Sequence, residues 1–179
     1  MKNLMQQAIV LTTAFLAVSG LAAKPVAYIY AVSGADKVSI TKGNQTIKAA
    51  KYLNLEENTV VKVPDGAGIT VFLASGKKIA FDQKAHFKIT AAGIEPLDGE
   101  TRALIEAKGE VLVRPLGGSR TDNKTEIPEM VKRELEAIDK NVADPAARSL
   151  LKIECYNKFG LKSRAHAEFD NYKKITGNK

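Results

Sequence analysis

Apolar and polar residues follow three different patterns along this chain of 179 residues. Residues 1–23 contain a continuous apolar run, residues 26–116 contain short β-branched runs between turn residues, and residues 125–176 repeat apolar residues at helical spacing. Strict alternation predicts strands, whereas a period of about 3.6 residues predicts helices. We therefore predict an α+β protein: a small all-β sandwich or barrel at 26–116, a linker at 117–124 and a three-helix segment at 125–176.

Residues 1–23 have the pattern of a cleaved signal peptide. Lys2 supplies a positive charge, residues 8–18 carry no charge, and small residues at Gly20 and Ala22 suit a cut before Ala23 or just after it. The alternative is an uncleaved membrane anchor, but the run is shorter than the ~20 apolar residues that span a bilayer. We expect export to the periplasm or beyond, and no membrane span once the segment is removed.

The β unit is predicted from short apolar runs that end at Gly, Pro, Asn or Asp. Turn residues recur about every eight to twelve positions, which is typical of a small sandwich or barrel. We also predict a hairpin with strands at 103–107 and 110–114 and a turn at Lys108-Gly109. The other predicted strands are residues 26–32, 38–41, 45–49, 59–63, 69–73, 78–81 and 85–90.

Motifs over residues 31–89 resemble a FecR-type domain. They are Val32-Ser33-Gly34, 38–43 (VSITKG), 55–60 (LEENTV), Pro64-Asp65-Gly66 and 75–79 (SGKKI). Two motifs depart from that family's pattern: Glu57-Asn58 replace the usual Gly-Asp, and Ala74-Ser75-Gly76 match its Asp-Gly-Ser turn only loosely. The resemblance implies an exported β module used for binding or scaffolding. The membrane helix of the family's iron-sensing regulators is not matched, so iron signalling is not implied.

Three helices are predicted at the C-terminal end. Ile127, Val131, Leu135 and Ile138 mark one face of the first helix, which Thr125 would cap. Asp144-Pro145 would begin the second helix, with its apolar stripe at Ala147, Leu151, Cys155 and Phe159 and its end at Gly160. The third is expected at about 163–175, with Ala165, Phe169 and Tyr172 facing inward.

The second and third helices resemble a single tetratricopeptide-type hairpin. Tyr156, Gly160, Ala165 and Phe169 stand at that repeat's spacing, while its Trp and Leu-Gly positions are not matched. These four residues are candidates for a partner-binding hairpin, although packing explains them better than contact with a partner. A solenoid needs about three or more repeats. Two alternatives remain open: the hairpin caps the β unit or itself, or it binds a partner or a second copy.

Composition narrows the class of partner. The formal charge is +7, the lysines are spread along the chain, and there is no Trp. Recognition of nucleic acid uses clustered Arg and stacked aromatic residues, so we expect no nucleic-acid partner. Cys155 is the one cysteine and has no partner for an internal disulfide.

The sequence offers no catalytic, cofactor-binding or metal-binding set. His86 and His166 lie far apart, and a zinc site needs three or four converging ligands. We expect His86 to be an exposed strand residue, His166 a solvated helix residue and Cys155 a core residue, because a reactive thiolate prefers a helix N-terminus or a basic pocket. The hypothesis is an exported bacterial cell-envelope protein without catalytic activity that binds or scaffolds a protein or cell-wall component. A self-associating structural protein is the alternative.

Overall fold

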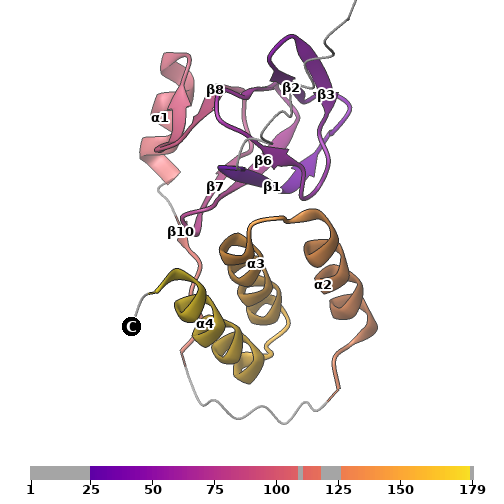
Figure 1. Ribbon diagram of the computed structural model, residues 1–179. Coiled ribbons are helices and arrows are strands. Elements are labelled where there is room, and N and C mark those ends of the chain that lie inside the picture. Colours follow the sequence, from indigo (N-terminus) through magenta and orange to yellow (C-terminus); the bar gives the residue numbers. More distant parts are fainter. Residues whose placement is uncertain (1–24, 109–110, 118–125, 178–179) are drawn as a thin grey trace, which may run out of the picture.

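The structure is a computed structural model that describes residues 25–108, 111–117 and 126–177. The predicted signal peptide, most of the predicted linker and Thr125 lie outside these residues. Over the described ranges the chain forms ten strands and four helices. Figure 1 shows the strands as one layered body, with the helices α2, α3 and α4 side by side against it.

The strands form two antiparallel five-stranded sheets. The first sheet has the order β10-β7-β6-β1-β4 and the second has the order β3-β2-β5-β8-β9. The predicted strands between residues 26 and 90 are all present, and β4 and β9 were not predicted. The bounds are β1 Ala27–Ser33, β2 Ser39–Lys42, β3 Gln45–Lys48, β4 Asn54–Leu55, β5 Val60–Val63, β6 Gly68–Leu73, β7 Lys77–Phe81, β8 Ala85–Thr90, β9 Gly93–Pro96 and β10 Val111–Leu112.

A first apolar core lies between the two sheets. It contains Ile29 and Val71 from the first sheet and Ile40, Val61 and Phe87 from the second, all fully buried. The alternation of apolar and polar residues at 38–41 predicts that one face of this strand packs into the core. The structure agrees: Val38 and Ile40 are buried, while Ser39 and Thr41 are only partly buried. The sandwich prediction is thus confirmed as two packed antiparallel sheets, without any feature that is specific to one family.

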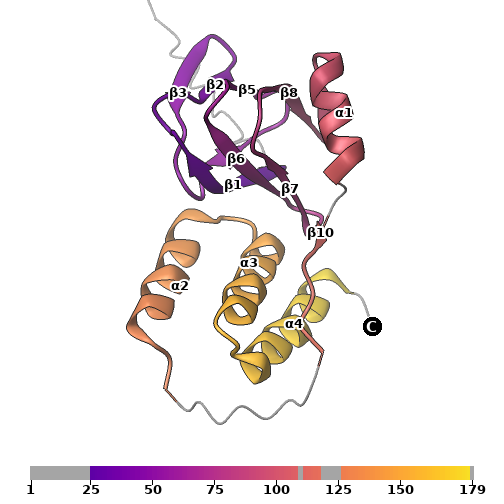
Figure 2. The ribbon, with the colours of Figure 1, turned by 180° about the vertical axis from the view of Figure 1, so that it is seen from behind.

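A second apolar core lies between the outer face of the first sheet and the helices. Tyr28 and Phe72 project from β1 and β6 and are fully buried, together with Ile138 of α2 and Leu151 of α3. Successive residues of a strand point to opposite faces, so Val71 packs into the first core while Phe72 packs into the second. The helices therefore cover one face of the sandwich, which Figure 2 shows from behind.

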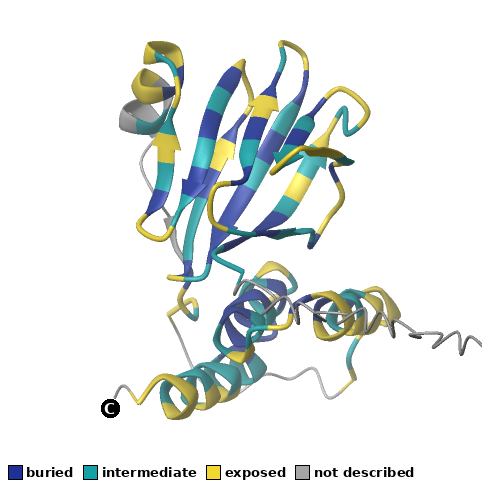
Figure 3. Ribbon diagram, turned by 45° about the horizontal axis from the view of Figure 1, so that its top comes forward, coloured by how far each residue is buried: buried dark blue, intermediate teal, exposed yellow. Residues whose placement is uncertain are grey.

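The three predicted C-terminal helices are present, at α2 Glu129–Asn141, α3 Pro145–Lys158 and α4 Lys162–Thr176. Ile127 was expected on the first helix but lies before α2. Asp144 caps α3, since its carboxylate accepts a hydrogen bond from the backbone N–H of Ala147 at 3.1 Å. Helix α2 begins after Pro128, with no side-chain cap among the described residues. Helix α3 lies between the other two and is the most deeply buried, as Figure 3 shows by its dark colour.

The prediction of a hairpin at residues 103–114 is wrong. Residues Gly99–Lys108 form the helix α1, and only Val111–Leu112 pair with β7 as a strand. The Asp98 carboxylate accepts a hydrogen bond from the N–H of Thr101 at 2.7 Å, which starts the helix in the manner of an N-cap. Thr101 and Ile105, four residues apart, face the sandwich, and Ile105 packs against the first core.

Candidate binding site

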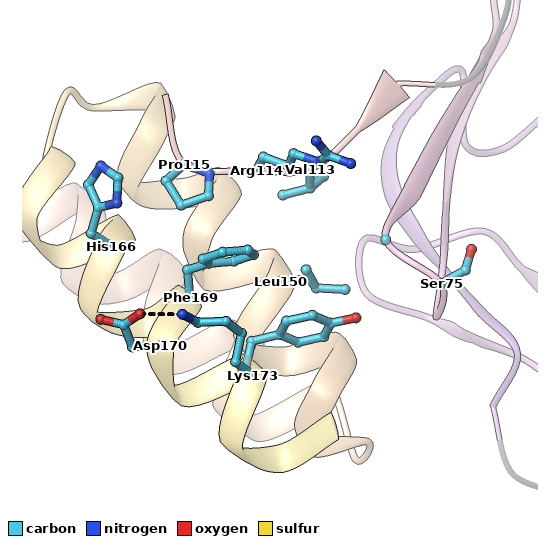
Figure 4. A pocket seen from close by; sticks show the side chains of 11 residues that line it. Ser75, Val113, Arg114, Pro115, Leu150, His166, Phe169, Asp170 and Lys173 are labelled. Carbon is cyan, nitrogen blue, oxygen red and sulfur yellow. Dashed lines mark ion pairs between the residues drawn. The ribbon is translucent and has the colours of Figure 1, made fainter. Parts of the chain in front are cut away.

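A cavity of about 530 Å³ lies where the sandwich meets the helices. Its walls come from the turn between β6 and β7, from residues 113–115, and from α3 and α4 (Figure 4). Its volume is within the roughly 300–1,000 Å³ of small-molecule pockets. The lining residues are Ser75, Gly76, Val113, Arg114, Pro115, Leu150, His166, Phe169, Asp170, Tyr172 and Lys173.

The turn after β6 forms one wall because it approaches α3 very closely. Gly76 has a φ of +87°, which L side chains rarely adopt, and a Cβ built on it would lie 3.0 Å from Cδ1 of Leu150. A glycine at this position thus allows the sandwich and the helix to meet. The neighbouring Ser75 is exposed at the rim.

Two aromatic rings of α4 form the opposite wall. Phe169 and Tyr172 are stacked, with ring centroids 6.2 Å apart and planes at 18°. They are both partly buried and pack against the second core. Lys173 lies over this wall: its Nζ is 5.6 Å from the centroid of the Phe169 ring and 3.1 Å from a carboxylate oxygen of Asp170.

Residues 113–117, which we name the connecting segment, run from β10 along the helices. The carboxamide of Asn157 on α3 holds this segment by its backbone, accepting from the N–H of Leu116 at 3.2 Å and donating to the carbonyl of Arg114 at 2.6 Å. On the other side, the N–H of Val113 donates to the carbonyl of Gly76 at 3.0 Å. The third wall of the cavity is therefore anchored to both the helices and the sandwich.

Two polar side chains of the cavity are available to a ligand. Nε2 of His166 is buried and has no hydrogen-bond partner among the described residues. The side chain of Arg114 is exposed and makes no ion pair with any residue that the structure describes. Buried polar atoms without a partner are uncommon in proteins, so the His166 nitrogen marks a position where a bound molecule or water is expected.

A second polar cluster lies at the same junction but is already paired. Glu134 of α2 accepts hydrogen bonds from Tyr52 and Lys51, and Lys78 of β7 donates to Glu154 of α3. Nζ of Lys78 is also 5.1 Å from the centroid of the Tyr30 ring. We name these six residues the junction cluster; they hold the helices on the sheet.

Burial and charge shift the pKa values of this cluster. Desolvation, with the Glu154 and Glu134 charges nearby, raises the pKa of Tyr30 to about 12. Desolvation and the bond to Glu134 raise the pKa of Tyr52. Burial acts to raise the pKa of Glu134, but the hydrogen bonds from Lys51 and Tyr52 outweigh it and leave this pKa below its usual value.

The four residues at tetratricopeptide spacing have separate places. Ala165 is fully buried, Tyr156 and Phe169 are partly buried against the second core, and Gly160 ends α3 with a φ of +69°. Phe169 alone among them lines the cavity. The hairpin thus packs on the sandwich, and its contribution to the site comes mainly from residues that the repeat spacing does not mark.

The other candidates from the sequence do not converge with this cavity. His86 lies in β8 and is partly buried, and its backbone N–H donates to Oγ1 of Thr101 at 2.7 Å. Cys155 has only 5% of its surface exposed, and burial, with the charge of Glu134 nearby, raises the pKa of its thiol to about 11. Its expected place in the core is confirmed.

Within the described ranges, no three His, Cys, Asp or Glu residues are grouped so that they could hold a metal ion. None of the helices described is both long and apolar enough to cross a bilayer. Comparison with protein-family models, with curated proteins and with solved structures found no match.

Sequence reasoning did not find the cavity because its walls are far apart in the chain. The sequence predicts a turn at Ser75 and Gly76, and it places residues 113 and 114 in the hairpin that proved wrong. One signal was present: Phe169, Tyr172 and Lys173 stand three and four residues apart, a spacing that places them on one helix face.

Proposed function

We propose that this chain is an exported bacterial cell-envelope protein that binds or scaffolds a protein or cell-wall partner and performs no catalysis. The observation that carries the proposal is the cavity at the junction, built jointly by the sandwich, the connecting segment and α4. A preformed, largely apolar pocket with a few polar groups is the usual form of a binding site. Export is proposed from the pattern of residues 1–23, and the FecR-type motifs support a binding or scaffolding role.

Binding explains the cavity better than catalysis does. Ser75, His166 and Asp170 all line it, and these residue types form the triads of some hydrolases. In such a triad the histidine is hydrogen-bonded to the serine, but Nε2 of His166 has no hydrogen-bond partner among the described residues. Figure 4 places Ser75 on the far side of the cavity from His166 and Asp170. The arrangement would surround a ligand and does not assemble a nucleophile with its base.

Binding of a partner also explains the surface better than self-association does. Strand β3 is an outer strand of its sheet, and most of its residues are exposed. It has only four residues and carries Lys48, and short charged edge strands resist pairing with another copy. Self-association through this edge would appear as a mass that rises with concentration in light scattering.

Capture from a native envelope fraction tests the proposal. The chain from Lys24 onward is cross-linked in that fraction, recovered by a tag and compared with two variants. Ser75→Trp places an indole at the exposed rim of the cavity, and Asn44→Trp adds the same group to an exposed turn elsewhere. We expect one enriched partner that Ser75→Trp loses and Asn44→Trp keeps. Equal recovery by both variants would contradict binding at the cavity.

A further inference from the structure

From the walls of the cavity we infer the chemical class of its ligand: an amphiphilic carboxylate, in which an apolar group carries the acid. The inference rests on the proposed binding function and goes beyond it by naming what the site recognises. Its basis is a juxtaposition of an apolar wall and a positive charge within one cavity.

The apolar part of the ligand would lie between the two facing walls. The stacked rings of Phe169 and Tyr172 line the cavity from α4, and Leu150 and Val113, which are 2% and 3% exposed, lie deeper. Pro115, on the connecting segment, lies beside the Phe169 ring (Figure 4). Burial of an acyl chain or an apolar side chain here would be favoured in proportion to the area removed from water.

The charged part of the ligand would lie at Lys173 and Arg114. Lys173 forms an ion pair with Asp170, with Nζ 3.1 Å from a carboxylate oxygen. Arg114 makes no ion pair with a described residue. The cavity therefore has one positive charge in excess. Its lysine stands over the Phe169 ring, which places a cation beside the apolar surface. A ligand that carries a carboxylate on an apolar group matches this geometry, since the carboxylate can contact the cation while the apolar group contacts the aromatic wall.

Other ligand classes fit less well. An uncharged apolar molecule would leave Arg114 and Nε2 of His166 without a partner. A nucleotide or a sugar phosphate carries more negative charge than this cavity balances, and its polar atoms would be buried against Leu150 and Val113 without hydrogen bonds. A single carboxylate on an apolar group would balance the excess positive charge and bury its apolar part against the apolar walls.

Two acids and their neutral counterparts test the class. The probes are decanoate with decan-1-ol, and N-acetyl-leucyl-phenylalanine with its C-terminal amide. Each is titrated into the isotope-labelled chain from Lys24 onward, and backbone amide shifts are followed by NMR. We expect shifts at Ser75 and Gly76, in the connecting segment and along the α4 residues of the cavity. Because charge-assisted hydrogen bonds are the strong ones, an acid should bind about tenfold more tightly than its neutral counterpart.

Variants distinguish the contribution of the positive charge to binding from that of the space in the cavity. Arg114→Gln changes an exposed side chain and should weaken the acid about threefold, the size expected for a solvent-exposed ion pair. Lys140→Gln, on an exposed position of α2 outside the cavity, should change nothing. Ser75→Trp should abolish binding of acid and neutral probe alike, and an unchanged amide spectrum elsewhere would show that the fold is kept.

The outcomes distinguish the ligand class from the proposed function. Binding of either acid with the expected preference supports the class, and the acid that binds identifies a fatty acyl chain or a peptide C-terminus as the source. Equal affinity for acid and neutral probe, shifts outside the cavity, or no binding of either acid would overturn the class. The binding function itself would survive such a result, provided that capture from the envelope fraction is still lost in Ser75→Trp.

Discussion

The hydroxyl of Tyr52 donates a hydrogen bond to the carboxylate of Glu134, which lies 82 residues further along the chain. Tyr52 belongs to the loop before β4 and Glu134 to α2, so this bond joins the sandwich to the helices. The Tyr52 backbone has a φ of +63°, an uncommon conformation for a residue with a side chain. The Tyr52 side chain is buried in the second core.

Removal of the Tyr52 hydroxyl should destabilise the fold. We expect Tyr52→Phe to lower the free energy of unfolding by about 1.5–3 kcal/mol, because it leaves a charged, partly buried carboxylate with one hydrogen bond fewer. Urea denaturation followed by circular dichroism measures this value. Tyr156→Phe is the matched control, since no hydrogen bond of its hydroxyl is found among the described residues. An equal effect of both changes would show that the Glu134 bond contributes nothing specific.

Stability should depend on pH through Glu134. Its pKa is lowered below the usual 4.5 in the folded state, so its contribution is present above that value and is lost as the pH falls through the folded pKa. We expect Glu134→Gln to be less stable than the unchanged chain at neutral pH, with a difference that shrinks in acid. Denaturation midpoints between neutral and acid pH measure this difference. Glu136→Gln, at an exposed position of the same helix, is the control and should change stability little at any pH. A stability difference for Glu134→Gln that does not change with pH would contradict the role of its charge.

The sandwich and the helices should unfold together. Phe72 is fully buried between them, and Phe72→Ala should cost about 3–5 kcal/mol. Because the second core belongs to both parts, circular dichroism of the helices and tyrosine fluorescence should report one coincident transition. Met130→Ala, at an exposed position of α2, should change stability by less than about 0.5 kcal/mol. A fluorescence transition well separated from that of the helices would mean that the two parts are independent.

Cys155 should be unreactive in the folded chain. It is 5% exposed and its thiol has a pKa raised to about 11, whereas thiol reagents attack the exposed thiolate. We expect slow labelling by iodoacetamide at neutral pH and rapid labelling after unfolding in urea. Met130→Cys provides an exposed thiol in the same chain and should be labelled quickly without urea. Fast labelling of Cys155 in the folded chain would show that α3 opens readily.

Most strands and three helices were predictable because each depends on local sequence. Alternation at Val38 and Ile40 indicates β2, and Asp144-Pro145 indicates the start of α3. The error at residues 103–114 has a physical cause. Lys108-Gly109 was interpreted as a turn, although Asp98 and Glu100 provide the cap and the acidic first turn of a helix.

The site was not predictable because it depends on contacts between distant segments. Neither the period of β6 nor that of α3 shows that Gly76 meets Leu150 or that Asn157 holds the connecting segment. Val71, Phe72 and Leu73 form a continuous apolar run, which is consistent with a strand buried on both faces, but the run does not show that helices cover the outer face. The sequence left open whether the helical hairpin caps the β unit or binds a partner, and the structure packs it on the sandwich.

Site-specific photocrosslinking in the native envelope shows directly whether a partner binds in the cavity. A benzophenone amino acid replaces Tyr172 inside the cavity in one chain and exposed Met130 on α2 in another. We expect one dominant cross-linked species from position 172. Ser75→Trp should remove this species, and position 130 should not give it. Identical products from both positions, or none from position 172, would contradict a binding site at the junction of the sandwich and the helices.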